Sequence, residues 1–510
     1  MADKNENTNM KKSREPQFEL LRIVAMLMVI TLHYLGKGQL LGRPADSLLL
    51  KGGVWYLEAL CIVSVNIYVM ISGYFMIDSK FNLRKLLILW CQILFYSVGI
   101  TLVCLLCGIV SLDDLLNVFT IQYYCLPVIN QHYWFATAYI IFYILSPLLC
   151  AGIRQLDRKQ HGILLLLLLL FTSAVKSFLP VKVALDDSGY SVLWFIVLFV
   201  LATYIRRYGM GFFAGKRLRS LLVYLFSSAA IVLCNGIFTK YGARFTDASD
   251  GVVMVPFRYN FLLVVLSSVA LFYFVKDAKV KENAIVKFLV KIAPYSFGVF
   301  LLHEHLLLRY EWVTRLGVTE VMPIPQRIGH YLAVVLGIYA AGVIIDFLRK
   351  LLFDAAEKLI LWGWGIYMKN REIFDYLIVG FATTVVSWVA LVIFLKMLGS
   401  WEETARVLVA NALSWVVSVI FAYITNRSFV FHSKKTGFVE VTKEFIGFTA
   451  ARLFSFGVDE GLMFVFTLIH MNVIVAKAIV SIVVIVLNYI LSKLWIFKKS
   501  DGKEQADAKD

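Results

Sequence analysis

Charged residues are scarce in this chain of 510 residues: Asp, Glu, Lys and Arg make up 16% of it, whereas 60% is hydrophobic. This balance excludes soluble globular and disordered proteins, because both need far more polar surface. Cysteine is also scarce, with 7 residues that all precede position 235. Cys104 and Cys107 lie in an apolar run and are interpreted as packing residues of a helix, not as a metal or redox site. The composition predicts an all-α polytopic membrane protein.

Acidic residues are fewer than basic ones, 34 against 50, which gives a net charge of +16. The basic residues collect between apolar runs, alternately dense and sparse, so they indicate membrane topology and no nucleic-acid partner. The positive-inside rule then places both termini in the cytoplasm, with fourteen spans between them. We expect these spans at 18–36, 54–77, 86–110, 133–150, 162–180, 191–205, 220–238, 257–275, 293–308, 330–348, 374–396, 407–431, 445–469 and 473–497.

The N-terminal basic residues Lys11, Lys12 and Arg14 precede an apolar run, as in a signal peptide. No small-residue cleavage site follows His33, so a retained signal anchor is expected. The main break in composition comes at 351–373, where charged residues surround Trp362 and Trp364. It predicts an interfacial linker between a ten-helix domain at 1–350 and a four-helix domain at 374–499, followed by a polar tail at 500–510.

The first span contains two ionisable residues, Arg22 and His33, in the run FELLRIVAMLMVITLH. Such residues in hydrocarbon cost roughly 2.5 to 3.5 kcal/mol each, so they usually face a bundle interior and have a function. Eleven residues of helix rise about 16 Å, which places Arg22 near the cytoplasmic surface and His33 past the midplane. Glu19, one turn before Arg22, is positioned to pair with it. Taken singly, Arg22 also fits a snorkelling anchor.

The ninth span offers a companion to His33 in the run SFGVFLLHEHLL. His303 lies at a similar depth there, with Glu304 and His305 following on other helix faces. A further histidine, His132, precedes the fourth span. A histidine deep in a span needs a partner or an aqueous cavity, and a packing role for His33 remains the alternative.

These residues together resemble acyltransferase family 3, integral-membrane enzymes that O-acylate surface polysaccharides and related acceptors. The resemblance covers about 15–350 and rests on the spacing of Arg22 and His33 after Glu19, on NIYVMISGYFM at 66–76, on the Tyr-Trp-Phe start of the fourth span and on SFGVFLLH at 296–303. The chain departs from the family at Asn66, where many members have aspartate.

The resemblance implies transfer of an acyl group from cytoplasmic acyl-CoA, such as acetyl-CoA, to a hydroxyl outside. Arg22, held by Glu19, is then expected to bind the CoA phosphates together with Arg84 and Lys85. His33 and His303 are the catalytic candidates, either as a base toward the acceptor hydroxyl or as a transient acyl carrier, and the sequence leaves both open. No bound cofactor and no metal are expected.

Two further residues of this domain are expected to act by positioning. Ser72 lies in the Ser-Gly pair of the second span, where close helix contact is the usual role of such a pair. Trp134 stands in the Tyr-Trp-Phe motif.

The second domain contains an internal repeat. The segments FAYITNRSFVF at 421–431 and LNYILSKLWIF at 487–497 align without gaps, with an aromatic and a basic anchor at the end of each span. Two helices separate the copies, so the pattern predicts a parallel repeat of helix pairs.

The first helix of this domain carries Gly380, Thr383 and Thr384, Asn411 enters the second helix, and Asn426 and Arg427 close it. With these residues, 374–497 resembles the GtrA-like family, four-helix membrane proteins linked to translocation of polyprenyl-phosphate sugars. The third helix carries Arg452, Ser455 and Asp459 on one face. With Asn426 and Arg427 of the second helix they are candidates for binding a lipid phosphate; a structural network that clamps the four helices is the alternative.

The sequence thus favours a bacterial plasma-membrane O-acyltransferase that acts on a surface glycan or polyprenyl-linked sugar. Its second domain is expected to translocate or hold a lipid-linked sugar, with the bilayer and a membrane glycosyltransferase as further partners. A fourteen-helix lipid-linked sugar transporter without catalysis is the main alternative, although 18–200 and 200–350 do not look like related halves. A catalytically silent scaffold is the third interpretation.

Overall fold

A computed structural model describes residues 15–43, 47–178, 187–241, 253–433, 437–471 and 473–497 of the chain. The chain divides into two compact units, Met1–Leu352 and Phe353–Asp510, and each is considered by itself. Lys11, Lys12 and Arg14 and the tail at 500–510 lie outside the described residues. The described residues contain no β-strand, which agrees with the all-α class predicted from the sequence.

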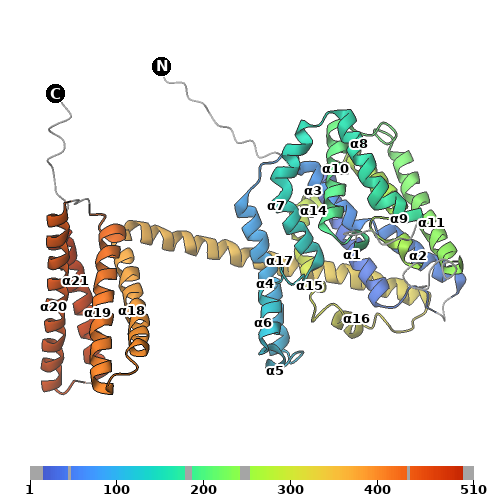
Figure 1. The fold of residues 1–510 in the computed structure, drawn as a ribbon. Helices are drawn as coiled ribbons and strands as arrows, with labels where there is room; N and C mark the ends of the chain where they lie inside the picture. The colour runs from blue at the N-terminus through green and yellow to red at the C-terminus, as the bar shows by residue number, and fades with distance from the viewer. Residues whose placement is uncertain are drawn as a thin grey trace, which may run out of the picture. The chain divides into compact units, whose positions relative to one another are not determined.

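The first unit is built from helices of very different length (Figure 1). They are α1 (Pro16–Lys37), α2 (Leu48–Cys61), α3 (Ser64–Met76), α4 (Leu83–Leu106), α5 (Leu112–Leu115), α6 (Val118–Cys125), α7 (Trp134–Gln155), α8 (Arg158–Leu169), α9 (Val175–Phe178), α10 (Val192–Tyr208), α11 (Arg217–Tyr241), α13 (Leu262–Lys276), α14 (Ala284–Ile292), α15 (Ser296–His303), α16 (Glu311–Arg315) and the part of α17 (Ile324–Lys369) up to Leu352.

The core of this unit surrounds α10, which is apolar on every side and buried over ten of its residues. It packs against α3, α7 and α8. The approach to α3 is close: a Cβ added at Gly73 would lie 3.2 Å from the Phe199 Cα and 3.1 Å from the Ala202 Cβ. This closeness explains the small residue after Ser72 and fixes α3 against the core.

Twelve helices or helix pairs among the described residues are long and apolar enough to cross a bilayer. Two of the fourteen expected spans are not among them. The span expected at 191–205 is α10, whose 17 residues rise about 25 Å and fall short of the roughly 30 Å hydrocarbon core. The span expected at 445–469 lies in α20 (Phe438–Leu468), which includes Glu444, Arg452 and Asp459. The chain is a polytopic membrane protein.

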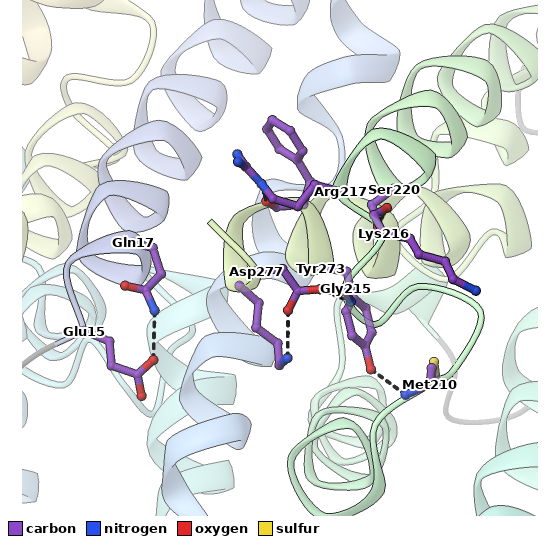
Figure 2. Close-up of polar contacts among 11 residues, drawn as sticks. Glu15, Gln17, Met210, Gly215, Lys216, Arg217, Ser220, Tyr273 and Asp277 are labelled. Atoms are coloured by element: carbon purple, nitrogen blue, oxygen red, sulfur yellow. Dashed lines mark hydrogen bonds and ion pairs between the residues drawn. The ribbon is translucent and has the colours of Figure 1, made fainter. Parts of the chain in front are cut away.

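The connection between α10 and α11 is tied to the end of α13 (Figure 2). The Tyr273 hydroxyl accepts a hydrogen bond from the Met210 amide at 2.6 Å. The Gly215 amide donates to the Asp277 carboxylate at 2.7 Å, and Lys276 pairs with the same side chain at 3.0 Å. Gly215 has φ +72, a conformation that glycine adopts without strain. These bonds hold the basic connection in one place.

The segment expected to be an interfacial linker is largely helical. Residues 351–369 continue α17, which runs for 46 residues before Asn370 interrupts it. Trp362 and Trp364 are both exposed on this helix, as interfacial anchors would be.

The second unit contains α18 (Arg371–Met397), α19 (Glu403–Thr425), α20 and α21 (Val473–Leu491), drawn from orange to red in Figure 1. The two repeat segments have the same structure. Each ends in a single π turn, Asn426–Val430 after α19 and Ser492–Ile496 after α21. The residues that follow, Phe431 and Phe497, stack on each other with ring centroids 4.9 Å apart.

The two helix pairs of this unit are linked crosswise. Arg427, just after α19, pairs with Glu444 of α20 at 3.2 Å. In the equivalent place Lys493, just after α21, pairs with Glu372 of α18 at 3.0 Å. Each pair therefore supplies a carboxylate to the cation of the other, and the repeat predicted from the sequence extends to these contacts.

Candidate functional site

Arg22 and His33 lie on α1, which begins at Pro16 after an extended Glu15. Arg22 Nη1 is 2.5 Å from Glu19 Oε1, the pairing that one turn of helix predicts. Glu19 is buried, whereas about a third of the Arg22 side chain is exposed. The guanidinium is thus held at one end while part of it stays open to solvent or to a ligand.

His33 meets His303 and Glu304 across the interface of α1 and α15. His33 Nδ1 lies 3.0 Å from His303 Nε2 and 3.2 Å from Glu304 Oε1. Lys37, one turn after His33, forms an ion pair with the same Glu304 oxygen. The structure therefore brings together the two predicted catalytic histidines and adds two residues to them.

Lys37 and Glu304 were missed as site residues because their signals are indirect. Lys37 stands four residues after His33 and shares its helix face. Glu304 follows His303 directly and would point elsewhere on a continuous helix, but α15 ends at His303, with Glu304 at its C-cap. The end of the helix frees the Glu304 carboxylate to reach α1.

The hydrogen bonds of His303 determine the tautomer of both rings. His303 Nδ1 is 2.6 Å from the Val299 carbonyl oxygen, which can only accept, so this nitrogen carries a proton. In a neutral ring His303 Nε2 is then an acceptor and must receive its hydrogen bond from His33 Nδ1. His33 Nε2 is left with a free lone pair, the form of imidazole that can remove a proton or attack a carbonyl.

His33 lines a cavity of about 200 Å³ inside the first unit. Most of its wall is apolar, and its polar or aromatic members come from α1, α2, α3, α7, α15 and the segments before α10 and α13. The lining residues are Met26, Val29, Leu32, His33, Glu58, Ile62, Val65, Tyr68, Trp134, Phe135, Tyr190, Tyr259, Phe297 and Phe300.

The cavity extends along α1 toward Arg22. Met26, Val29 and His33 all line it and follow at three- and four-residue steps, so the wall covers about 10 Å of one helix face. Tyr68 lines it as well, and its hydroxyl donates to the Arg22 carbonyl oxygen at 2.7 Å. The space beside His33 therefore ends about one helical turn from Arg22.

The other predicted residues of this unit lie at different distances from the cavity. Trp134 begins α7 and lines the wall. Ser72 donates to the Tyr68 carbonyl at 3.0 Å and accepts from the Tyr139 hydroxyl at 3.3 Å, so it joins α3 to α7 and does not line the cavity. Arg84 and Lys85 are exposed in the first turn of α4 and are not among the lining residues.

Asn66, where the chain departs from the family, has a satisfied buried side chain. Its amide donates to the Tyr259 carbonyl at 2.9 Å and to the Ser268 hydroxyl at 3.1 Å, and its oxygen accepts from Trp194 Nε1 at 2.9 Å. An ionised aspartate could not donate to the Tyr259 carbonyl. Asn66 is therefore a structural link beneath the cavity wall.

A buried network holds α15, and with it His303, against α4 and α17. Asp346 accepts hydrogen bonds from Gln92 at 2.9 Å, from Tyr96 at 3.1 Å and from Arg349 at 2.8 Å. Gly298 of α15 lies against the same carboxylate, because an added Cβ would be 2.4 Å from the Asp346 Cγ. No local sequence pattern pointed to this network, since its members lie far apart in the chain.

His305 and His132 form a second, separate histidine pair. Their ring centroids are 4.6 Å apart, and His305 Nε2 lies 3.1 Å from the Ser97 carbonyl. Both side chains are buried, and neither is among the residues that line the cavity.

His33, His303 and Glu304 could also hold a metal ion, since one donor atom from each lies within 4.8 Å of the others. The Lys37 ammonium already pairs with the Glu304 carboxylate, however, and competes with a cation for it. The expectation of a metal-free site stays a prediction.

The lipid-phosphate candidates of the second unit have protein partners. Arg427 pairs with Glu444, Asn426 donates to the Ala422 carbonyl at 2.7 Å, and Ser455 donates to the Arg452 carbonyl at 2.9 Å. Arg452 lies over the Phe448 ring, 5.0 Å from its centroid. Asp459 shares a face of α20 with Ser455 and is partly buried. This arrangement favours the clamping network over a preformed phosphate site for Arg427.

Comparison with known proteins divides the chain in the same way as its contacts. Residues 15–349 match the family described as acyltransferase domain, and residues 375–497 match the GtrA/DPMS transmembrane domain. A membrane protein of Bacillus subtilis, YwcD, is 33% identical over 126 residues, 24% of this chain and 95% of the relative.

Two further relatives are named cell wall teichoic acid glycosylation protein GtcA. The protein of Listeria monocytogenes is 34% identical over 129 residues and that of Listeria innocua 33% identical over 129 residues, in each case 25% of this chain and 86% of the relative. No solved structure matches the chain.

Proposed function

Because this chain belongs to the acyltransferase domain family through residues 15–349 and carries a GtrA/DPMS transmembrane domain after it, we propose that it is a membrane O-acyltransferase of the bacterial cell envelope. The donor is a cytoplasmic acyl-CoA, such as acetyl-CoA. The acceptor is a hydroxyl of a surface glycan or of a polyprenyl-linked sugar. The chain lies in the plasma membrane with both termini in the cytoplasm.

One observation carries this proposal: the free Nε2 of a histidine that lines an internal cavity. His33 Nδ1 is held by His303 and Glu304, at 3.0 and 3.2 Å. This fixes the ring so that Nε2 is available as a base. The Glu304 carboxylate, which is shared with Lys37, lies beside Nδ1 and offsets part of the positive charge that forms when Nε2 takes a proton.

The transfer then proceeds in balanced steps. His33 Nε2 takes the proton of the acceptor hydroxyl while the oxygen attacks the thioester carbonyl of the donor. A C–O bond forms, the C–S bond breaks, and the CoA sulfur leaves with the proton returned by His33. We propose this direct route over an acyl-histidine, and covalent labelling distinguishes the two.

Arg22 supports the donor end of the same route. Glu19 holds its guanidinium in place. Arg22 and His33 are separated by a helical rise of about 16 Å along α1. Arginine binds phosphate oxygens by charge-assisted hydrogen bonds. The exposed Arg84 and Lys85 offer further positive charge for the CoA phosphates, although neither lines the cavity.

The GtrA-like unit supports a role of the reaction in glycan assembly. Relatives of this unit are named for teichoic acid glycosylation. We propose that it holds or translocates the lipid-linked sugar that the first unit modifies, beside a membrane glycosyltransferase. The fusion then keeps two activities on one pathway together.

The test is replacement of His33 by Ala in cells that depend on this protein for glycan acylation. Mass analysis of surface glycans should show loss of the acyl group at unchanged protein level, because removal of a general base lowers the rate about 10²- to 10⁴-fold. His470→Asn is the matched control: His470 is exposed in a turn at φ +56, a conformation that asparagine tolerates. Full acylation in the His33 variant would favour a transporter or a scaffold.

A second measurement separates the two histidine mechanisms. Purified protein incubated with radiolabelled acetyl-CoA alone should carry no covalent label. Label on the wild-type protein that is absent from the His33→Ala variant would instead identify an acyl-histidine intermediate.

A further inference from the structure

The cavity beside His33 contains a carboxylate that the proposed reaction does not use. Glu58 of α2 is the one carboxylate among the residues that line it. Only 6% of Glu58 is exposed, and its Oε2 has no hydrogen-bond partner among the described residues. Buried polar atoms without partners are rare in native proteins, and each one requires an explanation. A ligand in the cavity would supply the missing partner.

The wall near this carboxylate includes three aromatic rings. Trp134 lies 4.5 Å from Tyr190 and 5.8 Å from Tyr259, measured between ring centroids, and is nearly parallel to Tyr259. Tyr190 and Tyr259 are 4.8 Å apart. Rings of this kind offer broad apolar faces together with polar edges.

The backbone keeps these rings in place. Asn66 donates to the Tyr259 carbonyl oxygen at 2.9 Å. Gly189, just before Tyr190, has φ +91, and a Cβ added there would lie 2.8 Å from the Tyr259 Cβ. Only glycine combines this conformation with so close an approach. The aromatic wall is therefore a built feature of the first unit.

The geometry points to Glu58 and the three rings as the subsite for the acceptor, and we propose that they bind a sugar ring. The Glu58 carboxyl accepts a hydrogen bond from a hydroxyl beside the one that is acylated, while the rings pack against the apolar face of the sugar. The inference rests on the proposed O-acyl transfer and names the substrate class that its cavity recognises.

The residues that line the cavity favour the acceptor over the donor as the occupant of this subsite. The phosphates of a CoA donor need cationic partners, and the residues that line this cavity include no lysine or arginine. Arg22, about one helical turn beyond the other end of the cavity, attracts phosphate instead. The cation-free lining around Glu58 thus places the two substrates at separate ends of the route, with His33 between a sugar hydroxyl and the thioester.

The experiment uses full-length protein in nanodiscs, with radiolabelled acetyl-CoA and the methyl glycosides of glucose, galactose, N-acetylglucosamine and N-acetylgalactosamine. For the best acceptor, Glu58→Ala should raise the acceptor KM about tenfold or more, with the donor KM unchanged, because one substrate hydroxyl loses its partner. Glu58→Gln should stay within about threefold of wild type, since its amide oxygen still accepts a hydrogen bond. Glu311→Gln, in an exposed ion pair with Arg315, is the matched control.

Deoxy forms of that glycoside identify the hydroxyl. Wild-type protein should lose activity with one deoxy analogue, and Glu58→Ala should show no further loss with it, which a merely structural role of Glu58 would not produce. All variants are compared by elution volume and melting temperature, so that a misfolded variant is recognised. If Glu58→Ala misfolds, Glu58→Leu, which fills the space but accepts no hydrogen bond, serves in its place.

The outcomes separate the two proposals. Wild-type protein that acylates none of the glycosides overturns the proposed function and this inference with it. Normal wild-type transfer with unchanged Glu58→Ala kinetics, or with a raised donor KM alone, overturns this inference only. Equal losses in Glu58→Gln and Glu58→Ala would mean that the negative charge itself is needed, and would replace the neutral sugar by a cationic acceptor.

Discussion

The two rings of the His33–His303 pair differ in what they can do. His303 uses Nδ1 for the Val299 carbonyl and Nε2 for His33, so neither nitrogen is free for a substrate. His33 keeps Nε2. The sequence predicted both histidines as catalytic candidates, because it showed only their residue type and their depth in a span. Which ring meets the substrate depends on hydrogen bonds between helices that lie 270 residues apart.

This difference predicts unequal losses on substitution. His303→Gln should lower kcat about 10- to 100-fold, because it loosens the ring of His33 without removing the base, whereas His33→Ala should cost more. Steady-state kinetics over a range of pH make the comparison, since a change in the environment of His33 moves the pH profile. Equal losses with identical profiles would contradict the positioning role of His303.

The ion pair of Lys37 with Glu304 predicts a coupled effect on stability. Both side chains are about 85% buried. Lys37→Met removes the cationic partner of the buried Glu304 carboxylate, leaves it only His33, and should destabilise the protein by about 3 kcal/mol. Adding Glu304→Gln should recover part of the lost melting temperature. A double-mutant cycle on the purified protein measures the coupling between the two residues. Additive effects would show that the two charges do not interact.

At the scale of elements, the long apolar runs predicted most of the helices, and the residues at their termini determine where the helices end. The sequence predicted α10 and α20 as membrane-spanning helices, and both are helices. However, α10 is too short to cross a bilayer, and α20 carries several charged residues. The Asp346 network could not be predicted, because Gln92, Tyr96 and Gly298 reach it only after the helices pack.

The contact of α15 with α17 predicts a strong effect of one methyl group. Gly298→Ala would place a Cβ 2.4 Å from the Asp346 Cγ, so the helices must separate, and we expect a loss of about 1 to 3 kcal/mol together with lower acyl transfer. Gly337→Ala in α17 is the control, since nothing lies within 4 Å of its added Cβ. The melting temperatures of the two variants are compared; equal values would refute the close packing.

At the scale of the whole molecule, the division into two units follows both contacts and family matches. The first unit has its own core and contains the cavity, His33 and the proposed acceptor subsite. The composition break near 350 indicated this division from the sequence. The pairing of α1 with α15 could not be read from any local pattern, because it depends on how the intervening helices fold.

The division predicts a partial loss of function on truncation. A chain that ends at Lys369 keeps α17 whole and should transfer acetyl groups to a methyl glycoside at close to the full-length rate, while acylation of surface glycans in cells falls. Loss of both activities, with the shortened protein intact in the membrane, would show that the second unit is required for the chemistry itself.

The crosswise ion pairs of the second unit have a consequence for its origin. Arg427 pairs with Glu444, and Lys493 pairs with Glu372. Each of these two cations therefore finds its carboxylate on the other helix pair. Two copies of a single ancestral helix pair could have satisfied each other in the same way, as a symmetric dimer. Duplication and fusion of such a gene would yield the present arrangement, with the stacked Phe431 and Phe497 at the former dimer axis.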